Sequence, residues 1–137
     1  GFKREKIYAY ISDGGIQEEV SQGAGRMAGH LGLDNLIMFY DANDIQLSTP
    51  TADVTSEDTA LKYKAWNWNV LEIDGNNPEQ IRKALKAANE ETARPTLIIG
   101  HTIMGKGARK AAKALNAIVE RTAHHLEATP ISKQLRT

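Results

Sequence analysis

The chain lacks several features that mark whole classes of protein. It has no cysteine among its 137 residues, which excludes disulfide bonds and thiolate metal sites. Its 17 basic residues equal its 17 acidic ones, so no net charge attracts it to nucleic acid or to an anionic membrane. It contains no apolar run of membrane-spanning length, and its first residues do not form a signal peptide. We therefore expect a soluble, cytoplasmic domain with no nucleic acid or membrane partner.

Short, mostly apolar runs alternate with segments of helical spacing. The runs, which predict strands, are residues 7–11, 36–40, 70–73 and 96–99. The helical segments are residues 18–31, 58–66, 78–88 and 111–122. In the first helix, Val20, Met27, Ala28 and Leu31 are spaced to share one face. This alternation predicts an α/β fold, with a doubly wound, mostly parallel sheet, helices on both faces and a single domain over residues 1–137.

Oxygen-bearing side chains follow the first two predicted strands. Asp13 and Gly14 come after the first run, and Asn43 comes shortly after the second. Ligands of parallel sheets bind beyond the carboxyl ends of the strands. A carboxylate, an amide oxygen and a backbone carbonyl suit Mg²⁺, while a glycine at a helix start lets the backbone approach a phosphate. The alternative is that Asp13 and Asn43 are ordinary turn residues.

A series of short motifs then runs in a consistent order through residues 8–107. Asp13-Gly14 is followed by Asn43-Asp44-Ile45, which resembles the signature of thiamine diphosphate enzymes. The further motifs are residues 31–37, 40–45, 57–60, 68–70, 73–75 and 102–107. Together they resemble the transketolase family. The resemblance implies part of a thiamine-diphosphate-binding fold over residues 8–107, followed by a divergent helical tail over 108–137.

The resemblance implies a role for each matching position. The Mg²⁺ ligands would be Asp13, Asn43 and the backbone carbonyl of Ile45. The thiamine diphosphate would be bound by Asp13, Gly14, Asn43, Leu47 and Met104. Leu47 and Met104 correspond to apolar positions beside the thiazolium ring. No residue of this chain is assigned to catalysis.

Several positions depart from the family pattern. Ser12 replaces a glycine, and Gly23 replaces the second of two interface glutamates, of which Glu18 matches the first. His124 and His125 lack the flanking residues of the family's pocket histidine. Either histidine could be its remnant, or both could lie on a solvated helix end.

Two glycine-rich segments imitate nucleotide-binding motifs. Residues 23–29 resemble a dinucleotide fingerprint but fall inside a predicted helix, so we interpret their small residues as a close packing surface. Residues 100–107 resemble a P-loop, yet Gly107 occupies the position of the Ser or Thr hydroxyl that binds Mg²⁺. Trp66 and Trp68 are expected to pack where a helix meets a strand.

The resemblance implies part of a transketolase that transfers two-carbon ketol units between sugar phosphates in the pentose phosphate pathway. The family's upstream segment and its pyrimidine-binding domain have no counterpart in these residues. We therefore expect a chain that is inactive alone, and that assembles as a homo-oligomer or with a complementary chain carrying the pyrimidine-binding domain. A component of a related decarboxylating dehydrogenase is an alternative within the same class, that of an enzyme part. A non-catalytic thiamine diphosphate or metal-binding module, and a ligand-free structural remnant, remain alternatives.

Overall fold

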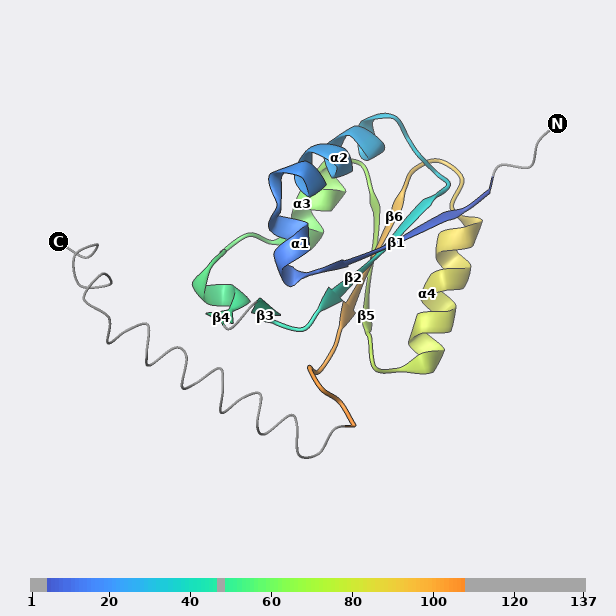
Figure 1. Cartoon of the computed structure of the whole chain (residues 1–137). Helices are drawn as coiled ribbons and strands as arrows, with labels where there is room; N and C mark the ends of the chain where they lie inside the picture. The colour runs from blue at the N-terminus through green and yellow to red at the C-terminus, as the bar shows by residue number, and fades with distance from the viewer. Residues whose placement is uncertain (1–4, 47–48, 108–137) are drawn as a thin grey trace, which may run out of the picture.

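The computed structural model describes residues 5–46 and 49–107, which form a parallel β-sheet with flanking helices (Figure 1). The sheet has four strands in the order β1-β2-β6-β5, and all neighbouring pairs are parallel. These strands are β1 (Ile7–Ser12), β2 (Leu36–Ala42), β5 (Asn69–Asp74) and β6 (Thr96–His101). Two short strands, β3 (Ile45–Gln46) and β4 (Thr49–Pro50), pair antiparallel in a separate sheet. The predicted α/β class and parallel sheet are confirmed.

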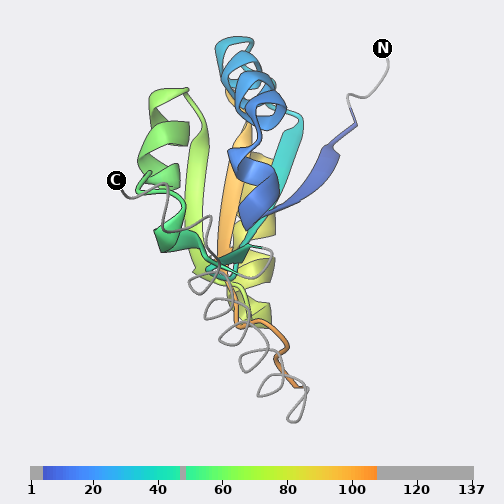
Figure 2. The same cartoon turned by 60° about the vertical axis from the view of Figure 1, so that its left-hand side comes forward.

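Helices cover both faces of the sheet, as expected for a doubly wound fold (Figure 2). They are α1 (Asp13–Gln17), α2 (Glu19–His30), α3 (Thr59–Ala65) and α4 (Pro78–Glu90), with a 3-10 turn, η1, over Thr51–Asp53. From β1 through β2 to β5 the chain advances across the sheet, which puts α1, α2 and α3 on one face. The step from β5 to β6 reverses direction. Because parallel crossovers are right-handed, the reversal puts α4 on the opposite face.

The period-two alternation of the central strands divides the core between these faces. Tyr40 and Ile99 face the layer of α1, α2 and α3. Ile37 and Ile98 face α4, where they pack with Ala84 and other residues. Successive side chains of a strand point to opposite faces, so one nearly continuous apolar run supplies both cores.

The helix ends follow local sequence signals. Asp58 caps α3, since its carboxylate accepts a hydrogen bond from the Leu61 amide at 2.8 Å. Asn77 caps α4 by accepting from two backbone amides, and Pro78 occupies the first turn. Both starts agree with the sequence-based expectation, because capping depends on residues that are close in the chain.

The buried face of α2 differs from the apolar stripe that its sequence displays. Of the four residues expected to share one face, Val20, Met27 and Leu31 are 84%, 54% and 60% exposed, whereas Ala28 is buried together with Gly25 and Gly29. The small residues allow α2 to approach the segment between α3 and β5, so that the bulkier side chains point outward. The glycines therefore serve close packing, as we inferred, and the large apolar residues of this helix do not form the core.

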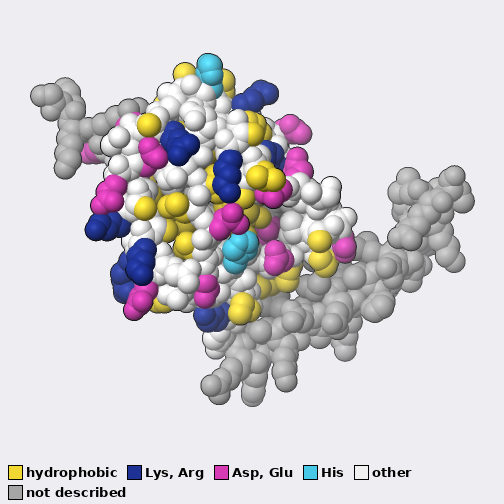
Figure 3. Space-filling view, turned by 180° about the vertical axis from the view of Figure 1, so that it is seen from behind, with side chains coloured by type: hydrophobic (Ala, Val, Ile, Leu, Met, Phe, Trp, Pro, Cys, Tyr) yellow, Lys and Arg dark blue, Asp and Glu magenta, His cyan; other side chains and the backbone are white. Residues whose placement is uncertain are grey.

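The surface is of mixed charge. On the face seen in Figure 3, acidic and basic side chains are interspersed among uncharged ones. None of the helices in the described part of the chain is long and apolar enough to cross a membrane.

Candidate functional site

The carboxyl ends of β1 and β2 bring the predicted site residues together. The two strands are neighbours, and their register pairs Ile11 with Tyr40. Asp13 begins α1 directly after β1 and is only 1% exposed. Its Oδ1 accepts a hydrogen bond from the Tyr40 hydroxyl at 2.7 Å, and its Oδ2 accepts one from the Asn43 amide at 3.0 Å. The parallel pairing therefore joins two segments that are 30 positions apart in the chain.

A tight turn after β2 places Asn43 beside Ile45. The Asn43 Oδ1 accepts a hydrogen bond from the Ile45 amide at 3.1 Å. Asp44, between them, has a φ of 62°, a left-handed conformation that Asp and Asn adopt more readily than most residues. Consecutive hydrogen bonds thus link Asp13, Asn43 and Ile45.

A cleft of about 450 Å³ opens next to these residues. Gly14 and Ile45 line it, together with Ser12 and Glu18. Gln17 also lines it and connects its two sides, because its side-chain amide donates to the Asp13 carbonyl at 2.9 Å and to the Gln46 side chain at 2.5 Å. The cleft therefore lies beyond the strand ends, where ligands of parallel sheets bind.

A second cavity, of about 210 Å³, concentrates negative charge around Asp13. Its carboxylates are Asp13, Asp44, Glu57, Asp58 and Glu72. His101 contributes the imidazole. Burial raises the pKa of the Tyr40 phenol well above its usual range, and the hydrogen bond and negative charge of Asp13 raise it further. The phenol therefore stays protonated and donates to the carboxylate at neutral pH.

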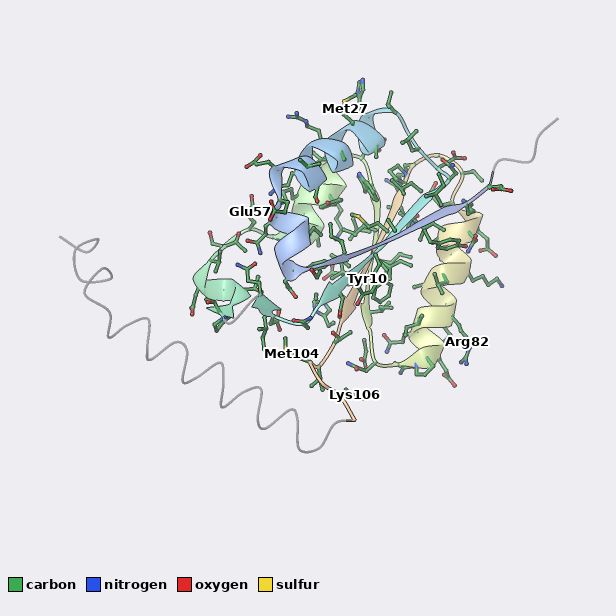
Figure 4. All side chains as sticks on the ribbon, in the orientation of Figure 1. Tyr10, Met27, Glu57, Arg82, Met104 and Lys106 are labelled. Carbon is green, nitrogen blue, oxygen red and sulfur yellow. The ribbon has the colours of Figure 1, made fainter. Side chains whose placement is uncertain are left out.

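The other predicted residues are not all beside the cleft. Met104 lies on the segment that leaves β6 and does not line either cavity (Figure 4). This segment is tied to the same edge of the sheet, since the Thr102 amide donates to the Ala42 carbonyl at 3.0 Å. Glu18 is exposed. Leu47, His124 and His125 lie outside the described residues, so their predicted roles stay predictions.

Sequence reasoning missed Tyr40 as a site residue. It was assigned to the apolar run of a strand and to the start of a family motif, without a role at the site, although its hydroxyl contacts Asp13. The available signal was its even spacing from Met38 and Ala42, which places all three on one face of β2.

Within the glycine-rich segment of α2, Gly25 and Gly29 form a packing surface. A Cβ at Gly25 would lie 3.2 Å from the Tyr63 ring, and one at Gly29 would lie 1.7 Å from the Trp66 carbonyl oxygen. The Trp68 indole donates to the Gly25 carbonyl at 2.8 Å. Trp66 and Trp68 therefore pack at the junction of α3 and β5, as expected.

A family model described as the thiamine diphosphate binding domain of transketolase matches residues 2–122. The chain belongs to the transketolase family. This membership confirms the resemblance inferred from the order of motifs. It also agrees with the fold, because the first two motifs meet at the strand ends.

Individual relatives give the same result. The transketolase of Streptococcus pyogenes is 45% identical over 104 residues, which cover 75% of this chain and 14% of that protein. The transketolase of Physarum polycephalum is 43% identical over 105 residues, which cover 75% of this chain and 16% of that protein. The chain thus spans 14% and 16% of the length of these two relatives.

Solved transketolase structures share the fold. A transketolase variant from Pichia stipitis superposes with a TM-score of 0.71 at 35% identity, over 74% of this chain and 15% of that one. The Leishmania mexicana transketolase superposes with a TM-score of 0.68 at 35% identity, over 70% of this chain and 15% of that one.

Proposed function

We propose that this chain is the part of a transketolase that binds Mg²⁺ and the diphosphate of thiamine diphosphate, through Asp13, Asn43 and the Ile45 carbonyl. The observation that carries the proposal is the buried Asp13 carboxylate beside Asn43. No lysine, arginine or histidine forms an ion pair with Asp13 among the described residues. Burial of a carboxylate is costly unless a cation compensates it. A divalent cation would supply that compensation.

The donor set suits Mg²⁺. Among the described residues, no three His, Asp or Glu side chains are grouped so that they could hold a metal ion by themselves. The proposed set contains one carboxylate, one amide oxygen and one carbonyl, and Mg²⁺ completes such sets with phosphate oxygens and water. Each Asp13 oxygen accepts one hydrogen bond and keeps a further lone pair for the cation.

Gly14 fits the diphosphate. A Cβ added there would lie 4.0 Å from its nearest neighbour, the Gln46 Cβ, and Gly14 lines the cleft. A side chain would therefore project into open space that a phosphate group could use, whereas glycine leaves that space free for a close approach of the backbone. Leu47 and Met104 are proposed to contact the thiazolium ring.

Thiamine diphosphate, when bound, supplies the carbanion chemistry of ketol transfer. The residues of this chain bind and orient its diphosphate end. The whole protein is proposed to act on sugar phosphates, and one related structure from Pichia stipitis is a complex with xylulose-5-phosphate. The family membership also supports a cytoplasmic enzyme of the pentose phosphate pathway.

Calorimetric titration with thiamine diphosphate and Mg²⁺, separately and together, would test the binding site. The chain should bind the cofactor only when Mg²⁺ is present, because the cation links Asp13 to the diphosphate. Asp13→Ala and the isosteric Asp13→Asn should abolish this binding. Asp53→Ala, which removes an exposed carboxylate from η1, is the matched control. Parent-like affinity in Asp13→Asn would contradict the assignment.

The same titration separates the alternatives. Failure of the parent chain to bind either ligand would favour a structural remnant.

Binding without turnover agrees with an incomplete site, which we expect because the pyrimidine end of the cofactor needs an acid from another segment or chain. A coupled assay with xylulose 5-phosphate and ribose 5-phosphate should therefore show no turnover by the chain alone. Turnover that disappears in Asn43→Ala would show that the site is complete.

A further inference from the structure

We propose that Tyr40 is a positioning residue that sets the affinity of this site for Mg²⁺ by holding the Asp13 carboxylate in its binding orientation. The proposal rests on the function proposed above. The Tyr40 ring lies in the core, and its hydroxyl donates a hydrogen bond to the Asp13 carboxylate. Tyr40 is not among the predicted ligands of Mg²⁺ or the cofactor.

The Tyr40 side chain is fixed by its surroundings. It lies on β2, is 7% exposed and belongs to the core cluster that includes Ile16 and Ile99. Its ring is therefore held by packing against α1 and β6, and its hydroxyl reaches Asp13 Oδ1 at 2.7 Å. A rigid ring with a single donor leaves the carboxylate little freedom to rotate.

The hydrogen bonds to Asp13 divide its two oxygens between a side chain and the backbone. Tyr40 donates to Oδ1, and the Asn43 amide donates to Oδ2. Of these donors only Tyr40 can be removed by a side-chain substitution. Without it the carboxylate keeps a single donor and can turn about its Cβ–Cγ bond. Partners of this kind orient metal ligands, and their loss typically lowers metal affinity by about 10–100-fold.

Tyr63 provides a matched control within the same core. It is 0% exposed and belongs to the same cluster as Tyr40. Its hydroxyl has no hydrogen-bond partner among the described residues. Tyr63→Phe therefore removes the same atom from the same core without touching the carboxylate.

The experiment measures Mg²⁺ binding by calorimetry at saturating thiamine diphosphate in the parent chain, Tyr40→Phe and Tyr63→Phe. We expect the Kd for Mg²⁺ to rise by about 10–100-fold in Tyr40→Phe and to stay unchanged in Tyr63→Phe. Ca²⁺ tolerates flexible coordination and Mg²⁺ demands a near-octahedral shell, so Tyr40→Phe should lose more affinity for Mg²⁺ than for Ca²⁺. General loosening of the core would weaken both cations equally.

The outcomes separate this inference from the proposed function. If Asp13→Asn loses Mg²⁺ and Tyr40→Phe binds like the parent, the role of Tyr40 is wrong while the site stands. If Asp13→Asn itself binds like the parent, the site is wrong. Equal losses in Tyr40→Phe and Tyr63→Phe would also overturn the positioning role.

A further test uses the parent chain, so it does not depend on whether a variant folds. The Tyr40 hydroxyl proton should remain protected from exchange in NMR spectra when Mg²⁺ and thiamine diphosphate saturate the site. Loss of this protection on binding would show that the cation displaces the hydrogen bond, and would overturn the proposal.

Discussion

At the residue scale, two glycines of α2 differ in the space that their surroundings leave for a side chain. A Cβ at Gly29 would lie 1.7 Å from the Trp66 carbonyl oxygen, which belongs to the backbone and cannot move aside. A Cβ at Gly23 would meet nothing within 4 Å. Only Gly29 is required by packing, since Gly23 carries the entropic cost of a glycine in a helix without a compensating contact.

We therefore predict that Gly29→Ala and Gly23→Ala change stability in opposite directions. Gly29→Ala should lower the free energy of unfolding by at least about 1–3 kcal/mol, because it overpacks a backbone contact. Gly23→Ala should raise it by about 0.5–1 kcal/mol, because alanine restricts the unfolded chain more than glycine does. Urea denaturation measures both values. Destabilisation by Gly23→Ala would show that this position has a contact outside the described chain.

At the element scale, the outer face of α2 is an apolar surface that nothing in the described residues covers. Val20, Met27 and Leu31 lie on this face and are more than half exposed. Strand β1 is also an edge strand of the sheet, and unpaired edges favour association. These two features support the proposal that the chain forms an oligomer.

We predict that the chain sediments as a dimer or a larger species at micromolar concentration. The double substitution Val20→Ser with Met27→Ser should shift it toward monomer, because it removes apolar area from the outer face of α2. Val54→Ser is the control, since Val54 is 54% exposed but lies after η1. A parent chain that is monomeric in sedimentation velocity would count against self-association.

At the scale of the whole molecule, ionisation of tyrosine phenols makes the free energy of unfolding depend on pH in the alkaline range. The hydrogen bond from Tyr10 to Asp41 raises the Tyr10 pKa from 10.0 to about 12, with a further contribution from burial. Burial raises the Tyr63 pKa to about 12 and also raises that of Tyr40. The folded chain thus favours the neutral phenols more strongly than the unfolded chain does. Their contribution is complete below pH 10 and is lost as pH rises through the folded pKa values.

We expect the free energy of unfolding to fall between about pH 10 and pH 12, where the unfolded phenols ionise first. Tyr63→Phe removes one of these groups, so it should lose less stability than the parent chain over the same interval. Urea denaturation at a series of pH values checks this. An equal loss in both chains would show that the Tyr63 phenol does not contribute.

Much of the fold and part of the site could be predicted from sequence because they depend on residues close in the chain. The strand runs, the caps of α3 and α4, and the turn that contains Asn43 all follow from local residue types. The order of motifs also identified the family, since that order can be recognised in the sequence without knowing which residues are in contact. Asp13 could be placed at a strand end on the same basis.

Contacts between distant segments were decided only by the tertiary structure. The order β1-β2-β6-β5 departs from chain order, and no local signal states which strands become neighbours. The apolar stripe of α2 predicted a helix, but close approach at Gly29 decided that Val20 and Met27 face outward. The pairing of Tyr40 with Asp13 likewise joins residues 27 positions apart, through strands that meet only in the folded sheet. Periodicity predicted the helix, whereas packing determined which of its residues are buried.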